Sequence, residues 1–222
     1  MIINPYTLKK VDLLTFFTKR CQHNHKYSEH PNCFITELNH EPRIGYLDIE
    51  TNGFNADFHL MGSYAIKVHG SDKIYGRYIT AKELASPDLD KKLTEDCIND
   101  LMKFDKIVTY YGTLFDIPFI RAKALSHGLD SFPLYGLVHH TDVYFIAKSK
   151  LKIARKSLHS VCNLLGIEGK DHVDGALWRR AFVHRSEKDL AIIWAHNKQD
   201  VIVLEEVYKK LIPYIANTKK SI

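Results

Sequence analysis

Two carboxylates directly follow an apolar strand-like run of this chain. The run Ile44-Gly45-Tyr46-Leu47 leads directly into Asp48-Ile49-Glu50. Successive side chains of a strand point to opposite faces, so Asp48 and Glu50 lie on the same face. Neighbouring carboxylates repel each other, and a hard divalent cation relieves that repulsion. The pair therefore predicts a strand that carries a metal site for phosphate chemistry. The alternative is a pair of ordinary charges on an edge strand.

Length and composition limit the classes of protein to consider. The 222 residues, 45% of them hydrophobic, suffice for one domain with a small appendage. The net charge of +5 is compatible with a polyanionic partner. No apolar run reaches the about 20 residues that cross a bilayer, and the first residues lack a signal-peptide core. Four cysteines in a chain of this length are no disulfide framework. We therefore expect a cytoplasmic protein, a nucleoid or viral setting included, with no membrane partner.

Hydrophobic periodicity and turn residues predict the order of the elements. We expect strands over 44–49, 60–68, 73–79 and 106–111 and near 137–141. We expect helices over 8–20, 89–103, 117–127 and 157–165, from Asp142 onward, and from Ser186 to about Pro213. Residues 21–42 are rich in His, Cys, Asn and Pro and are predicted to be a loop. Three strands followed by alternating helices and strands indicate an α/β protein with a mixed sheet flanked by helices.

Two further acids lie far along the chain. Asp116 follows a strand and a glycine-containing turn, and it opens the next helix. Asp200 lies within the last predicted helix, and His196 precedes it by one turn on the same helix face. A helix N-cap is the alternative role for Asp116, and a solvated helix surface is the alternative for Asp200 and His196.

Taken together, these segments resemble the three motifs of a known nuclease family. Asp48-Ile49-Glu50-Thr51, Phe115-Asp116 and the helical segment ending at Asp200 match the four-acid (DEDD) 3′–5′ exonucleases of the ribonuclease H-like superfamily. The resemblance spans about residues 43–212. It is nearest to stand-alone relatives of the proofreading exonuclease domain of family B DNA polymerases, and the segment Ser157–Gly166 supports it.

The resemblance implies a fold and a mechanism. Residues 43–216 would form a ribonuclease H-like exonuclease domain, preceded by a small extension over residues 1–42. Two Mg²⁺ or Mn²⁺ ions would be held by four acidic residues and would activate water and stabilise the leaving 3′-oxygen. His196 would orient or deprotonate that water. The expected metal ligands are Asp48, Glu50, Asp116 and Asp200.

The chain departs from the family pattern at two points. Family members often carry Asn five residues before the second-motif acid, where this chain has Tyr111. The third motif combines the spacing of the Tyr class with the residue of the His class, because His196 stands four residues before Asp200. Asp142 is interpreted as an N-cap or as a supporting residue near the site.

The implied substrate is the 3′ end of single-stranded DNA or a frayed duplex, and the product a nucleoside 5′-monophosphate. Three alternatives stay open: trimming of RNA 3′ ends, a nucleic-acid-binding module without catalysis, and an adaptor that docks on an unidentified protein through residues 1–40. Basic residues could follow phosphates or simply be solvated. Aromatic residues near the motifs could stack on bases, although each is expected to be core. The basic residues are Lys150, Lys152, Arg155 and Lys156, and the aromatic residues include Phe54, Phe58, Tyr110, Tyr111 and Tyr144.

The predicted loop contains a second candidate metal site. Cys21, His25, His30 and Cys33 would make a Cys₂His₂ set within a short segment. Thiolates and imidazoles are the usual ligands of structural Zn²⁺. A loop this polar has no core of its own, so a metal could hold it together. A loop without metal and a loop that contacts substrate are the alternatives.

Overall fold

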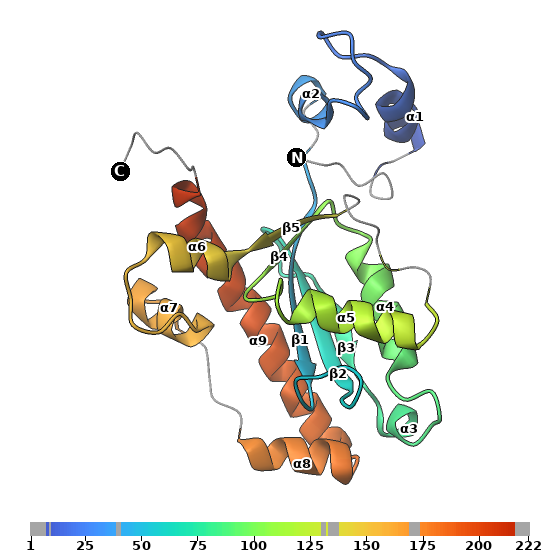
Figure 1. Ribbon diagram of the computed structural model, residues 1–222, viewed down its shortest axis with the longest axis vertical. Coiled ribbons are helices and arrows are strands. Elements are labelled where there is room, and N and C mark those ends of the chain that lie inside the picture. Colours follow the sequence, from blue (N-terminus) through green and yellow to red (C-terminus); the bar gives the residue numbers. More distant parts are fainter. Residues whose placement is uncertain are drawn as a thin grey trace.

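The computed structural model describes residues 8, 10–38, 41–129, 132, 138–168 and 174–215. Over these residues the centre is a five-stranded sheet with strand order β3-β2-β1-β4-β5 (Figure 1). β1, β2 and β3 pair antiparallel, whereas β4 and β5 extend the sheet parallel to β1. The predicted α/β fold with a mixed sheet is thus confirmed. The strands are β1 (Ile44–Thr51), β2 (Met61–Val68), β3 (Ile74–Tyr78), β4 (Lys106–Thr109) and β5 (His139–Asp142).

Helices cover both faces of the sheet and also precede it. α1 (Lys10–Thr18) and α2 (Pro31–Glu37) lie beyond the end of the sheet at which β1 begins (Figure 1). Within the described ranges, no helix is long and apolar enough to cross a membrane. The remaining helices are α3 (Ala81–Leu84), α4 (Lys91–Leu101), α5 (Asp116–Ser126), α6 (Val143–Lys150), α7 (Leu158–Leu165), α8 (Gly175–Val183), α9 (Glu187–Leu211) and the 3₁₀ turn η2 (Ile212–Tyr214).

The alternation of β1 divides the hydrophobic interior into two clusters. Leu47 and Ile49 pack with α4 and α5 on one face of the sheet. Tyr46 points to the opposite face, into a cluster that α6, α7 and α9 complete. Because strand side chains alternate, Asp48 and Glu50 lie on the same face as Tyr46. The two acids are therefore directed toward α9, the last long helix.

Buried polar contacts fix α9 on the sheet. Its N-cap is Ser186, whose hydroxyl accepts a hydrogen bond from the Asp189 amide. Further along, Glu205 forms a buried ion pair with Lys67 of β2. The Glu205 carboxylate also accepts a hydrogen bond of 2.8 Å from the Gly70 amide. The two Glu205 contacts join α9 to β2 and to the turn that follows it.

The sequence predicted the strands and most of the helices, but it did not predict three of the helices. The five expected strands are present, and the start of the one expected near residue 137 lies outside the described residues. Residues 21–42 were expected to be a loop, but α2 forms within them, because Pro31 starts the helix and Cys33 and Phe34 bury its apolar side. The helices α3 and α8 were not predicted either. Short helices of this kind owe their stability to tertiary packing.

Candidate active site

Asp48 is held by an asparagine of α9. The Asn197 side-chain amide donates a hydrogen bond of 2.6 Å to Oδ2 of Asp48. The Asn197 carbonyl in turn accepts a hydrogen bond of 3.0 Å from the Ser63 hydroxyl on β2. Asn197 is fully buried, so its amide has a fixed orientation. This pair of contacts fixes one carboxylate oxygen and directs the acid toward the space between β1 and α9.

Asp116 contacts β1 at the edge of the strand that faces β4. β4 pairs with β1 only as far as Tyr46, so the amide of Ile49 has no strand partner on that edge. Oδ1 of Asp116, the first residue of α5, accepts a hydrogen bond of 3.1 Å from that amide. The alternative N-cap role is wrong, because the N-cap position is Phe115. Asp116 thus lies beside the residue that separates Asp48 from Glu50.

Burial changes the acidity of this carboxylate. Asp116 is 4% exposed, and loss of hydration raises its pKa to about 7, against the opposing effect of the Ile49 hydrogen bond. The nearby Asp142 carboxylate adds to the increase. A positive ion bound beside such a group favours its charged form.

The third motif completes the cluster from α9. Nε2 of His196 lies 3.7 Å from Oδ2 of Asp200 and 3.9 Å from Oε1 of Glu50. One donor atom from each of these three residues lies within 4.8 Å of the others. Asp200 is buried, so the interpretation as a solvated helix face is wrong, and His196 is largely covered as well. Spacing by one helical turn brings both side chains to β1, as predicted.

Asp142 supports the turn that leads to Asp116. It is the N-cap of α6 and accepts a hydrogen bond of 3.0 Å from the Tyr144 amide. It also accepts hydrogen bonds from the amides of Tyr111 and Thr113, at 2.8 and 2.9 Å. Tyr111 has a φ of +69°, a conformation that asparagine tolerates better than tyrosine. The carboxylate of Asp142 therefore holds a strained turn, and the family preference for Asn at position 111 has a physical reason.

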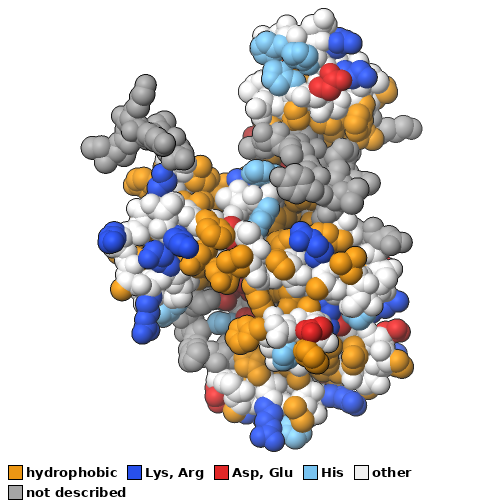
Figure 2. Space-filling model, in the orientation of Figure 1, with side chains coloured by type: hydrophobic (Ala, Val, Ile, Leu, Met, Phe, Trp, Pro, Cys, Tyr) orange, Lys and Arg blue, Asp and Glu red, His pale blue; other side chains and the backbone are white. Residues whose placement is uncertain are grey.

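The predicted nucleic-acid contacts lie outside this cluster. Lys150, Lys152 and Arg155 are exposed at the end of α6 and in the segment after it, where Figure 2 shows Lys and Arg side chains gathered. Lys156 is half-buried and donates to the Ile153 carbonyl. The expectation that each aromatic residue near the motifs belongs to the core is wrong for Phe54, Phe58 and Tyr111, which are 85%, 81% and 43% exposed. Phe54 and Phe58 lie in the loop that follows β1.

The Cys/His segment also forms a cluster, with one change of member. Cys21, His30 and Cys33 come together as expected, but the second histidine is His23. His25, which the sequence predicts as a member of the set, lies outside this group of four donors. The reason is the local turn between Cys21 and His25.

Comparisons with known proteins place the chain in a family. The RNase_H_2 family model, described as RNase_H superfamily, matches residues 45–212. The chain therefore belongs to the RNase H superfamily, and the resemblance inferred from the three motifs is confirmed at the level of the family. This membership places the chain in a superfamily of nuclease type.

Two particular relatives are DNA polymerases. A curated DNA polymerase of Methanocaldococcus jannaschii is 31% identical in an alignment of 121 residues that covers 44% of this chain and 7% of the polymerase. The family B DNA polymerase of the hyperthermophilic archaeon Pyrobaculum calidifontis matches in structure with a TM-score of 0.63 at 16% identity. That match covers 79% of this chain and 25% of the polymerase chain. This chain thus corresponds to a small part of each relative, and the structural match establishes the shared fold.

Sequence reasoning missed Asn197 and Ser63. Asn197 stands between His196 and the acid of the third motif, three residues before Asp200. Positions three apart share a helix face, so the spacing from Asp200 was a usable signal for Asn197. Ser63 gave no comparable signal, because it acts only through Asn197.

Proposed function

We propose that the chain is a metal-dependent 3′–5′ exonuclease that removes nucleoside 5′-monophosphates from single-stranded DNA or frayed 3′ ends. The observation that carries the proposal is the convergence of acids from three elements. β1 supplies Asp48 and Glu50, α5 supplies Asp116 against the Ile49 amide, and α9 supplies Asp200 beside Glu50. Membership in the RNase H superfamily supports the same reaction class.

The donor set fits hard divalent cations. Carboxylate oxygens are the ligands that Mg²⁺ and Mn²⁺ prefer. Asp48, Glu50, Asp116 and Asp200 would hold two such ions, which supply an activated water and charge stabilisation at the leaving oxygen. The chain itself provides the orientation: Asn197 fixes one oxygen of Asp48, and the Ile49 amide fixes one oxygen of Asp116.

His196 is proposed as the residue that orients the attacking water or takes its proton. Its Nε2 lies 3.9 Å from Oε1 of Glu50 and 3.7 Å from Oδ2 of Asp200. Imidazole is suited to proton transfer near neutral pH. The same distances would also permit His196 to bind a metal ion directly, and a kinetic experiment described in the Discussion separates the two roles.

The surroundings of the site suit an unpaired strand. Phe54 and Phe58 stand exposed in the loop that directly follows β1, and the ring centroids of Phe54 and Phe115 are 6.3 Å apart. Exposed aromatic rings next to a nuclease site can stack on bases without reading sequence. We propose that Lys150, Lys152, Arg155 and Lys156 follow the phosphates further along the strand.

The alternatives give different experimental results. An RNA-trimming enzyme would use the same acids and differ only in substrate. A binding module without catalysis would bind oligonucleotides and leave them intact, and an adaptor would not need a divalent cation. We retain the division into an extension over residues 1–42 and a nuclease domain over 43–216 as part of the proposal.

The test is a cleavage assay with 5′-labelled single-stranded DNA and RNA oligonucleotides, in Mn²⁺ and in EDTA. We expect products that shorten from the 3′ end in Mn²⁺ and no products in EDTA. Asp116→Asn should abolish cleavage while preserving the fold, because the amide oxygen can still accept the Ile49 hydrogen bond.

The matched control is Asp88→Asn, which removes an exposed carboxylate from the segment between α3 and α4. This variant should cleave at the wild-type rate. Cleavage by Asp116→Asn at the wild-type rate would refute the assignment. Binding of oligonucleotides by the wild-type chain without any cleavage would favour the module that lacks catalysis, and products from RNA alone would favour the trimming enzyme.

A further inference from the structure

Four soft donor atoms meet in the segment that precedes the sheet. Sγ of Cys21 lies 3.9 Å from Nδ1 of His23 and 3.6 Å from Nδ1 of His30. Sγ of Cys33 lies 3.3 Å from Nδ1 of His23 and 3.4 Å from Nδ1 of His30. All four atoms lie within 4.8 Å of one another. Each sulfur is thus in short contact with both nitrogens.

These distances match the edges of a tetrahedron around one ion. With Zn–S near 2.3 Å and Zn–N near 2.0–2.1 Å, a regular tetrahedron separates sulfur from nitrogen by about 3.5 Å. The four observed sulfur–nitrogen distances run from 3.3 to 3.9 Å. Ordinary hydrogen bonds explain the set less well, because a thiol carries one proton and each Nδ1 offers one site. A shared cation accounts for the four contacts together.

A tight turn explains why His23 and not His25 joins the set. The Cys21 amide donates a hydrogen bond of 2.9 Å to the His25 carbonyl, and the Asn24 amide donates one of 2.8 Å to the Cys21 carbonyl. Asn24 has a φ of +64°, which suits asparagine at a reversal of the chain. Cys21 therefore lies on the first limb of the turn, His23 lies near its tip, and His25 lies on the returning limb.

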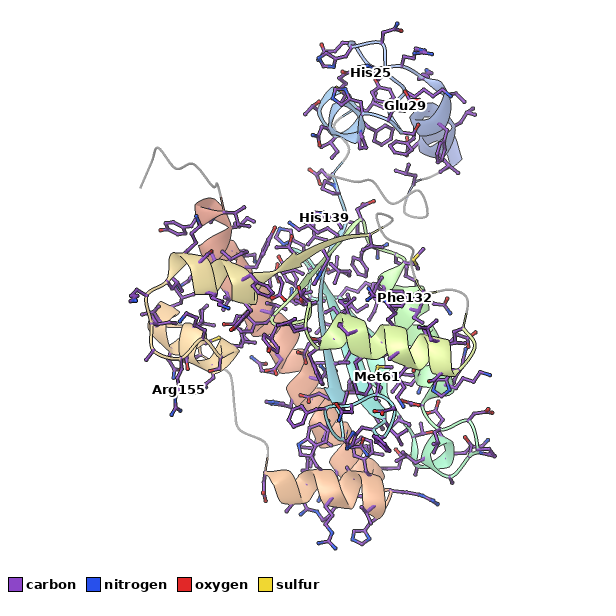
Figure 3. All side chains as sticks on the ribbon, viewed as in Figure 1. His25, Glu29, Met61, Phe132, His139 and Arg155 are labelled. Carbon is purple, nitrogen blue, oxygen red and sulfur yellow. The ribbon has the colours of Figure 1, made fainter. Side chains whose placement is uncertain are left out.

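The second pair of donors comes from the start of α2. His30 is the N-cap of this helix and Cys33 is its third residue. The Glu37 carboxylate, at the other end of α2, accepts hydrogen bonds from the Gln22 amide at 3.4 Å and the Tyr27 hydroxyl at 2.9 Å. These two hydrogen bonds join the C-terminal end of α2 to the segment that carries the turn. Figure 3 labels His25 and Glu29 in the segment that joins α1 to α2.

The hydrophobic interior of this segment is small. Its buried residues are two aromatic rings of helices α1 and α2, one tyrosine and the two cysteines themselves: Phe16, Cys21, Tyr27, Cys33 and Phe34. Modules of this size usually need a disulfide, a metal or a partner to fold. The two cysteines are free thiols, so no disulfide serves that purpose here. A bound metal supplies the missing folding free energy directly.

We propose that Cys21, His23, His30 and Cys33 bind one Zn²⁺ ion that holds residues 10–38 in their fold. Four protein donors fill a tetrahedral shell and leave no position for water or substrate, which is the pattern of a structural site. Sulfur and nitrogen donors select Zn²⁺ over the Mg²⁺ or Mn²⁺ that suits the carboxylates of the sheet.

The experiment measures zinc in the full chain by elemental analysis, after gel filtration in excess Mg²⁺ to occupy the carboxylate site. We expect about one Zn²⁺ per chain in the wild-type protein. His23→Ala and Cys33→Ser should lose it, and His25→Ala should keep it. Replacement with Co²⁺ gives a second measurement, because thiolate-to-cobalt charge-transfer absorption requires the cysteines. Cys97 and Cys162 are buried in α4 and α7 and cannot supply that absorption.

The outcomes separate the proposal from its competitors. Absence of zinc from the wild-type chain, or zinc that persists in Cys33→Ser, would overturn the site. Loss of zinc in His25→Ala with retention in His23→Ala would overturn the ligand set derived from the turn. Circular dichroism of each variant shows whether the sheet domain is still folded, so that loss of zinc is not mistaken for global unfolding. None of these measurements depends on nuclease activity.

Discussion

The two donor clusters of this chain are assembled in opposite ways. Cys21, His23, His30 and Cys33 come from one short segment with a small interior. Asp48 and Glu50 lie on β1, and Asp116 of α5 and Asp200 of α9 reach that strand only when the sheet and its helices are in place. In the first cluster a metal would build the fold, whereas in the second the fold builds the metal site. Removing metal should therefore destabilise the fold of the first region and abolish the activity of the second.

The donor atoms differ in the same sense. Sulfur and imidazole nitrogen in the first cluster favour zinc, and carboxylate oxygen in the second favours magnesium or manganese. His196 is the exception, because it places a nitrogen among the carboxylates. If that nitrogen acts on water, the second cluster would bind metal through oxygen alone. If it binds metal, the second cluster would contain a nitrogen ligand as well.

The largest effect that bears on this comparison is expected from His196→Ala. If His196 acts on the attacking water, the rate should fall by roughly 10²–10⁴ while the Mn²⁺ concentration for half-maximal activity stays constant. Initial rates across an Mn²⁺ titration measure both quantities. His196→Tyr, which restores the residue of the Tyr-class motif at the same spacing, should recover part of the activity.

The control for this prediction is His159→Ala, an exposed histidine on α7 that should have no effect. A higher Mn²⁺ requirement in His196→Ala would show that His196 is a metal ligand and would break the contrast between an oxygen site and a sulfur–nitrogen site. Unchanged kinetics in both His196 variants would remove the residue from the mechanism.

The elements that the sequence predicted share strong local signals. β1 was visible because an apolar run alternates with two acids, and α7 because Ser157 caps its start and Gly166 ends it in the left-handed conformation. The acids of the site followed from their motifs. Their meeting point depends on details beyond any motif, such as the Ile49 amide that β4 leaves for Asp116.

The features that the sequence did not reveal depend on tertiary contacts or on backbone reversal. α8 buries Leu177 and Ala181 and packs Trp178 and Phe182 against the core of the sheet domain, contacts that exist only in the folded chain. His23 and His25 lie two residues apart, and spacing alone could not choose between them. The reversal at Asn24 separates them, because it leaves His23 near the tip of the turn and His25 on the returning limb. Asn197 was missed because, apart from its three-residue spacing from Asp200, a helical asparagine resembles an ordinary helix residue.

A smaller effect is expected from Asn197→Ala. Loss of the hydrogen bond to Asp48 should lower activity or Mn²⁺ affinity by about 10–100-fold, as for other residues that orient metal ligands. The buried Ser63 hydroxyl would also lose its partner, at a cost of about 1–3 kcal/mol in the free energy of unfolding. Mn²⁺ titration and thermal melting measure the two effects separately.

Ser63→Ala is the matched variant for Asn197. It removes the hydroxyl that orients Asn197 but leaves the amide able to donate to Asp48, so its effect on activity should be smaller. Equal losses in both variants would mean that the amide has no special role toward Asp48. That result would mean that both residues contribute only to stability. It would also support the view that the fold as a whole, and not Asn197, positions the carboxylates.

The smallest effect concerns the polyanion and not the metal. Lys152 and Arg155 are exposed in the segment between α6 and α7, and Figure 3 shows Arg155 at the outer edge of this segment. If they contact phosphates, Lys152→Gln and Arg155→Gln should weaken binding of single-stranded DNA modestly and at all sequences. Each should also reduce the slope of log affinity against log salt by about 0.7.

Binding is best measured by fluorescence anisotropy in the Asp116→Asn background with EDTA present, so that no strand is cut. Lys82→Gln on α3 removes an equally exposed charge at a distant part of the sheet domain and serves as control (Figure 1). Because all three substitutions remove one positive charge, a general effect of net charge would lower the slope equally in each. A selective decrease for Lys152 and Arg155 would place the strand along the segment between α6 and α7. Equal decreases would leave the exposed rings of Phe54 and Phe58 as the main contact outside the carboxylates.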